Sequence, residues 1–192
     1  MKSQVSLSAA SCCLLVAAPA LAIRPVGITT GFERIETLSH STVSTTLAGV
    51  EQTSNIWRAG LGTNGGYSYS VPRVSLEYAW ESGLSIGFCA GAMVSWRTKT
   101  GPNIYVIEPR VGYYFELGNL GLWPRLGLTL HDLRGPDATH TALTLEVPLM
   151  TFKNPIGSFT VGPFLDLGLA GSQGDADQSV TEVGLGLGFQ SL

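Results

Sequence analysis

Apolar and polar residues alternate one by one over most of the chain after residue 70. In residues 71–80, one face carries Val74, Leu76, Tyr78 and Trp80, and the other carries Arg73, Ser75, Glu77 and Ala79. A side-chain period of two is the geometry of an extended strand with one apolar and one polar face. The same split recurs down the chain and predicts seven strands, at residues 71–80, 84–96, 105–115, 122–131, 143–149, 159–169 and 183–189.

The polar faces of these strands repeatedly carry Arg or Glu, which indicates the interior of a membrane-spanning barrel. Such a barrel turns apolar residues towards lipid and polar residues towards its lumen. Strands of about ten residues are long enough to cross hydrocarbon when tilted. We therefore predict an all-β fold, a closed antiparallel up-and-down transmembrane β-barrel. The alternative is a soluble, lipocalin-like barrel, which would bury the Leu-rich faces and expose the charged ones.

An eighth strand is expected before residue 71, because bacterial barrels of this kind have an even number of strands. Residues 27–38 are the best candidate, with Ile28, Thr30 and Phe32 on one face. The alternation fails at residues 33–36, which indicates either a bulge or the exit of the strand from the membrane. Residues 41–50 either extend this strand above the bilayer or form a separate hairpin.

The connections between strands alternate in length. Short turns are predicted at residues 81–83, 118–121 and 153–157, and longer polar loops at 51–70, 97–102, 132–139 and 171–179. Small barrels have short periplasmic turns and longer external loops, so both termini are expected on the periplasmic side. Pro109, Pro124 and Pro148 interrupt good strands, and each is expected at a bulge or near a rim.

Charged residues on the polar faces predict a lumenal charge network. Its members are Arg73, Glu77, Glu108, Arg110, Arg125, Glu146, Asp166 and Glu182. The interior of an eight-stranded barrel is wide enough only for side chains, and a buried charge must be paired. We interpret the network as a plug of salt bridges. The alternatives are a proton or ion path, or carboxylate catalysis between Glu108 and Glu146.

Aromatic residues near the ends of the predicted strands are typical of an interfacial girdle. They are Trp80, Trp96, Tyr105, Phe115, Trp123, Phe152, Phe159 and Phe189. A ligand-stacking cluster is the alternative interpretation.

His131 and His140, with Asp132 and Asp137 between them, offer nitrogen and carboxylate ligands for a divalent metal. Their spacing matches no known metal motif, and Gly135-Pro136 indicates an ordinary turn. We expect a solvated loop here, and we predict neither a metal nor a cofactor.

Residues 1–22 have the pattern of a cleaved signal peptide: Lys2, a short apolar stretch, and small residues around Ala20 and Ala22. Cys12 and Cys13 raise the alternative of a lipoprotein. Removing these residues leaves one domain at 23–192, with a net charge of (11 − 1) − 14 = −4 and Cys89 as its only cysteine. The lack of a basic run argues against a nucleic-acid partner. A mean hydropathy of +0.23 with 13% charged residues favours an apolar outer surface.

The chain resembles the small outer-membrane β-barrel proteins of Gram-negative bacteria, the group of the OmpA transmembrane domain and OmpX. The resemblance is carried by the signal peptide, the alternating strands, the hairpin rhythm and a last strand that ends in Gly188-Phe189. It departs where Gln190, Ser191 and Leu192 follow the aromatic residue that the assembly machinery reads in many such barrels. It implies a location in the outer membrane, with outer-membrane lipid and the barrel assembly machinery as partners.

The expected role is structural, or interaction at the cell surface through the external loops. A narrow channel for small solutes is the alternative, followed by a lipid-modifying enzyme. The lipid A deacylases of this group use a His-x-Ser pair, whereas His40 and Ser41 are adjacent here. We therefore predict that the protein is not an enzyme.

Overall fold

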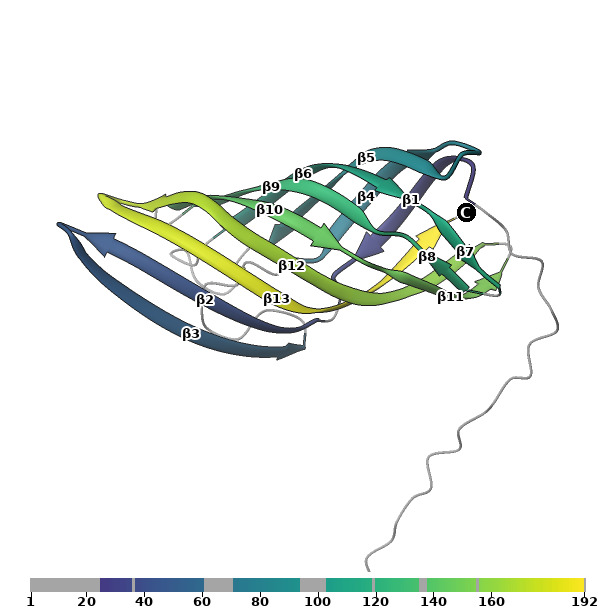
Figure 1. Ribbon diagram of the computed structural model, residues 1–192. Coiled ribbons are helices and arrows are strands. Elements are labelled where there is room, and N and C mark those ends of the chain that lie inside the picture. The colour runs from purple at the N-terminus through teal and green to yellow at the C-terminus, as the bar shows by residue number, and fades with distance from the viewer. Residues whose placement is uncertain are drawn as a thin grey trace, which may run out of the picture.

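The computed structural model describes residues 25–35, 37–60, 71–93, 103–118, 120–134, 138–154 and 156–191. Within these residues, thirteen strands form one antiparallel sheet (Figure 1). The strands are β1 (Gly27–Glu33), β2 (Thr37–Leu47), β3 (Val50–Gly60), β4 (Arg73–Ala79), β5 (Leu84–Met93), β6 (Asn103–Tyr113), β7 (Phe115–Leu117), β8 (Leu120–Leu122), β9 (Arg125–Arg134), β10 (Ala138–Glu146), β11 (Leu149–Asn154), β12 (Gly157–Gln173) and β13 (Ala176–Ser191). None of the described segments is a helix long and apolar enough to span a membrane.

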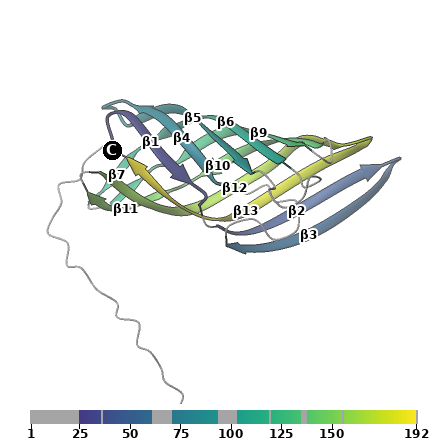
Figure 2. The same ribbon diagram turned by 180° about the vertical axis from the view of Figure 1, so that it is seen from behind.

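Eight of these strands close into a ring in the order β1-β4-β5-β6-β9-β10-β12-β13. The ring closes where β13 pairs with β1, at Gly31↔Gln190 and Phe32↔Phe189. Consecutive ring strands are antiparallel neighbours, so the barrel is up-and-down, as predicted. Short strands β7, β8 and β11 extend the wall at the end where the C-terminus lies, which we call the turn end (Figures 1 and 2). The opposite end is called the hairpin end.

The faces of the ring strands are inverted relative to a soluble barrel. Large apolar side chains such as Leu126, Leu145 and Val183 are exposed on the outside, while Arg73 and Glu108 are buried on the inside. The buried and exposed residues alternate strictly along β4 and along most of β6 and β10. The soluble, lipocalin-like alternative is therefore wrong.

The first barrel strand is interrupted at Arg34, which has a φ of 51°. Glu33 and Arg34 are consecutive but both buried, so the alternation breaks here as a bulge requires. After the bulge, β2 continues along β13 from Thr37↔Gly186 onwards. Strands β2 and β3 form a hairpin whose turn lies at Ala48-Gly49. Strand β2 stays paired with β13, and β3 lies beyond β2 (Figure 2).

Several strands are longer than their apolar residues predict. Strands β12 and β13 are joined by a tight turn at Gly174-Asp175, so the predicted loop at 171–179 is wrong. Residues 51–60 of another predicted loop form β3, and β9 and β10 take most of the loop predicted at 132–139. These segments lack the strict alternation, since Ile56 and Trp57 are consecutive and Leu133 stands alone between two charged residues, so the pattern marks the apolar belt rather than the full length of each strand. The loop predicted at 97–102 lies outside the described residues.

Two of the three strand prolines lie where they are expected. Pro124 separates β8 from β9, and Pro148 separates β10 from β11, both near the turn end. Pro109 instead lies in the middle of β6, opposite Phe88. The ladder between β6 and β9 is interrupted at residues 108–109, so the missing N–H of Pro109 coincides with a gap in the pairing rather than with a bulge or a rim.

Candidate functional site

The barrel interior holds all eight residues of the predicted charge network. They are supplied by β4 (Arg73, Glu77), β6 (Glu108, Arg110), β9 (Arg125), β10 (Glu146), β12 (Asp166) and β13 (Glu182). The structure adds Glu33, the last residue of β1, and Arg34, which follows it in the bulge. These ten residues, called the lumenal charge cluster, have between 0% and 6% of their surface exposed. The sequence pattern missed the two added residues because the alternation fails at that position.

Arg110 is the centre of the cluster. Its guanidinium donates hydrogen bonds to both carboxylate oxygens of Glu33, one of them at 2.6 Å, and to Glu77. A third carboxylate, Glu146, accepts from the same guanidinium at 3.3 Å. The guanidinium of Arg110 on β6 thus links β1, β4 and β10. Its planar, multidentate geometry suits Arg better than Lys.

Arg125 pairs with two of the same carboxylates. Its Nη1 donates to Glu33 Oε1 at 2.6 Å, and its Nε lies 3.1 Å from Glu77 Oε1. The guanidinium also lies over the ring of Trp123, 4.3 Å from the centroid. The cluster therefore ends, towards the turn end, on an aromatic side chain.

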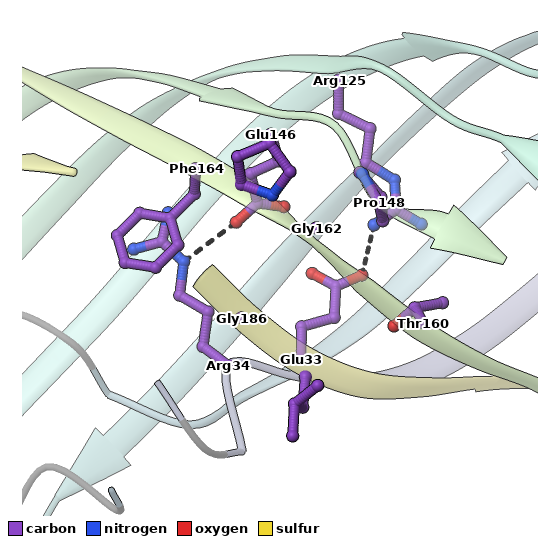
Figure 3. A pocket seen from close by; sticks show the side chains of 11 residues that line it. Glu33, Arg34, Arg125, Glu146, Pro148, Thr160, Gly162, Phe164 and Gly186 are labelled. Atoms are coloured by element: carbon purple, nitrogen blue, oxygen red, sulfur yellow. Dashed lines mark hydrogen bonds and ion pairs between the residues drawn. The ribbon is translucent and has the colours of Figure 1, made fainter. Parts of the chain in front are cut away.

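Arg34 reaches into the lumen from the bulge (Figure 3). Its two terminal nitrogens bind Asp166 at 2.7 and 3.0 Å, and its Nε binds Glu146 at 3.0 Å. The guanidinium also lies 3.9 Å from the ring centroid of Phe164. A bidentate pair of this kind is both strong and directional, so it ties the bulge to β12, two strands away in the ring.

Arg73 and Glu108 form a pair on the other side of the interior. Thr129 also donates to Glu108, at 3.0 Å. Gly127 provides the room, because an added Cβ would lie 2.7 Å from Glu108 Oε1. Glu182 is buried on β13, opposite Asp166 in the β12–β13 ladder.

Apolar side chains cover the charge cluster at both ends. At the hairpin end lies the outer apolar cluster, made of Val71, Ile104, Val106, Leu133, Ala138 and Val180. At the turn end lies the inner aromatic cluster, made of Ala79, Tyr114, Trp123 and Met150. Trp123 Nε1 donates to Ser85 Oγ at 2.9 Å, which satisfies its buried polar atom. Trp123 was predicted for the girdle and is instead fully buried in the interior.

The space left between the charges is small. A cavity of about 30 Å³ lies beside Glu33, Arg34, Arg125 and Glu146 (Figure 3). Such a volume holds roughly one water molecule. Glu108 and Glu146, the pair considered for carboxylate catalysis, are each engaged by an arginine.

The remaining aromatic residues of the predicted girdle lie on the outside wherever they are described. Trp80, Phe115 and Phe159 are exposed near the turn end, and Phe189 packs edge-on against Phe159 with centroids 5.5 Å apart. Tyr105 is exposed towards the hairpin end. Trp96 and the side chain of Phe152 lie outside what the structure describes.

The two histidines of the considered metal site lie in strands, so the expected solvated loop is wrong here. His131 on β9 and His140 on β10 are direct partners in the ladder, with ring centroids 5.6 Å apart. Both are buried in the interior. Asp132 points to the other face, and Asp137 is not among the described residues. In the described part of the chain, no three His, Cys, Asp or Glu residues are grouped to hold a metal ion.

Comparison with known proteins gives matches among solved structures. No family profile matches the sequence, and no curated protein matches it. Neisserial surface protein A is 14% identical over 86% of this chain and 96% of its own, with a TM-score of 0.43. Ail, the attachment invasion locus protein of Yersinia pestis, is 11% identical over 86% of this chain and 99% of its own, with a TM-score of 0.36. A structure of Ail with the heparin analogue sucrose octasulfate gives 12% identity, the same coverage and a TM-score of 0.33.

By its own strand order and closure, this chain is an eight-stranded, antiparallel, up-and-down β-barrel.

Proposed function

We propose that this protein is an outer-membrane barrel with a lumen closed by its own side chains, which presents a surface for interaction beyond the hairpin end. The observation that carries the proposal is the lumenal charge cluster, buried between the outer apolar cluster and the inner aromatic cluster. A barrel with this interior is a scaffold rather than a pore.

The apolar outer belt supports the membrane location. Leu143 and Leu145 on β10 are exposed, as are their ladder neighbours Leu128 and Leu126 on β9. Exposed apolar surface on this scale needs a cover of lipid or protein, and the ring gives each of its eight strands a hydrogen-bonded neighbour on both sides, as a span through lipid requires. The signal peptide at 1–22 stays a prediction outside the described residues. Export through it would deliver the chain to the barrel assembly machinery and to outer-membrane lipid.

The paired charges support a closed lumen. Each of Arg34, Arg110 and Arg125 contacts two or more carboxylates. Opening a path for ions would strand some of these charges without partners, at several kcal/mol for each. The apolar residues at both ends add a further barrier to water and ions.

Purified protein in planar bilayers is therefore expected to show no stable, reproducible conductance steps. The matched variant is Arg110→Ala, which removes the side chain at the centre of the cluster. Defined unitary conductance steps in the wild type that change or vanish in this variant would refute the closed scaffold and favour a channel. Protein recovered from the bilayer should keep its heat-modifiable gel migration, which shows that folded barrels were tested.

The hairpin β2–β3 supports a role in surface interaction. Its outer part exposes a polar stretch from Glu51 to Asn55, and β3 is the last strand on its side of the sheet. A strand at a sheet edge presents unpaired backbone N–H and C=O groups, which other proteins recognise by strand addition. This segment is the best candidate for contact with a protein partner in an extended conformation.

An epitope tag inserted between Ala48 and Gly49 should be accessible to antibody on intact cells. A tag inserted between Glu81 and Ser82, in the tight β4–β5 turn, should become accessible only after the outer membrane is permeabilised, because short turns face the periplasm. Labelling of the second site alone on intact cells would reverse the orientation. Labelling of both would contradict a sealed, membrane-spanning barrel.

A further inference from the structure

A groove lies on the outside of the barrel at the turn end. It has a volume of about 560 Å³ and is lined by Val26, Tyr78, Trp80, Glu81, Ser82 and Leu84. The start of β1 supplies one wall, since Gly27 pairs with Ala79 next to Trp80. The β4–β5 turn supplies the other, where Trp80 N donates to Leu84 O at 2.9 Å and Gly83 N donates to Trp80 O at 2.9 Å. The groove is therefore built on paired backbone and not on a loose loop.

The chemistry of the groove changes along the barrel axis. Tyr78 lies one step further towards the middle of the apolar belt, and its ring meets Trp80 edge-on with centroids 5.0 Å apart. Trp80 lies at the end of β4, and Glu81 and Ser82 follow in the exposed turn. Glu81 is the one charged residue among those that line the groove. Apolar and aromatic surface thus leads to a single carboxylate at the water side.

This gradient matches a phospholipid whose headgroup carries a positive charge. Ammonium groups bind to the faces of Trp and Tyr and to carboxylates, and Trp and Tyr prefer the depth of lipid headgroups. A headgroup of net negative charge would bring its phosphate near the Glu81 carboxylate with no cation to offset it, whereas a zwitterionic headgroup brings its own ammonium. Charge complementarity therefore favours lipids with an ammonium in the headgroup over lipids with a net negative charge.

We propose that this groove is a binding site for phosphatidylethanolamine. The primary ammonium lies at the Glu81 carboxylate beside Trp80, and an acyl chain follows Tyr78, Val26 and Leu84 towards the belt. The inference rests on the proposed membrane location, and it adds to that location a lipid preference at a defined place on the barrel.

The test uses the full folded chain in nanodiscs with equal amounts of phosphatidylethanolamine and phosphatidylglycerol. After release into mild detergent, native mass spectrometry counts the lipids that stay bound. We expect the wild type to retain phosphatidylethanolamine over phosphatidylglycerol by about fivefold, the size expected for one exposed ion pair with a cation–π contact. Glu81→Gln should bring the ratio close to one, and Trp80→Leu should lower it in part.

Glu116→Gln is the matched control, since Glu116 is an exposed carboxylate on β7 at the same end and does not line the groove. Its ratio should equal that of the wild type. Equal retention of the two lipids by the wild type, an unchanged ratio in Glu81→Gln, or an equal drop in Glu116→Gln would each overturn the site. Heat-modifiable migration of the same samples reports membrane insertion separately, so a barrel that inserts without a lipid preference refutes this inference alone.

Discussion

Replacing Arg110 with Met is expected to destabilise the folded barrel by about 3–5 kcal/mol, the usual cost of breaking a buried ion pair from one side. The change removes the shared partner of Glu33, Glu77 and Glu146 while leaving these carboxylates buried. Reversible urea unfolding in lipid vesicles, followed by tryptophan fluorescence, measures the free energy of unfolding. The loss should show as a lower urea midpoint with an unchanged slope.

Two further variants separate charge from geometry. Arg110→Lys keeps the positive charge but loses the planar guanidinium. Its free energy of unfolding should therefore lie between those of the wild type and Arg110→Met. Adding Glu77→Gln to Arg110→Met should recover part of the loss, because it removes one of the stranded carboxylates. An ordinary surface substitution changes the free energy of unfolding by no more than about 0.5 kcal/mol. A change as small as this in Arg110→Met would contradict the cluster as described.

The second large effect is expected on the outer face. Leu145 on β10 is 42% exposed, and its ladder neighbours Leu126 and Leu165 are apolar. An Arg that faces the middle of the bilayer costs about 2–4 kcal/mol in such a barrel. Leu145→Arg should therefore lower the free energy of unfolding by that amount in vesicles.

Thr139→Arg provides the matched control on the same strand and the same face. Thr139 is exposed at the hairpin end, where its ladder neighbours are Asp132 and Ser172. Near the interface the same substitution costs only about 0–1 kcal/mol. Equal losses at the two positions would mean that the outer belt does not face a bilayer.

The seven later ring strands and the eight predicted charges could be read from the alternation because lipid on one side and a crowded lumen on the other impose it. The outer ends of β9, β10, β12 and β13 carry no such constraint, so their length could not be predicted from apolar residues. Glu33 and Arg34 could not be predicted, because they are consecutive residues that both point into the interior, which breaks the alternation at the bulge. Trp123 was misplaced because an aromatic residue near a strand end fits the belt and the interior equally well. The alternation that places Arg125 and Thr129 in the interior continues through Pro124, and it places Trp123 on the same interior face.

The interruption at Arg34 also bears on how the barrel folds. Neighbouring hairpins such as β4–β5 bring together residues close in sequence, whereas ring closure must join the start of the chain to its end, and such distant pairings form slowly. The β1–β13 ladder has the partners Gly31↔Gln190 and Phe32↔Phe189, while the β2–β13 ladder runs from Thr37↔Gly186 to Thr46↔Asp177. Strand β13 therefore closes the ring through its pairs with β1 and binds the β2–β3 hairpin along the rest of the same edge. The hairpin proposed to meet a partner thus shares one edge of β13 with the ring closure, and we expect substitutions that weaken the β2–β13 ladder to affect the pairing of β13 as well as recognition.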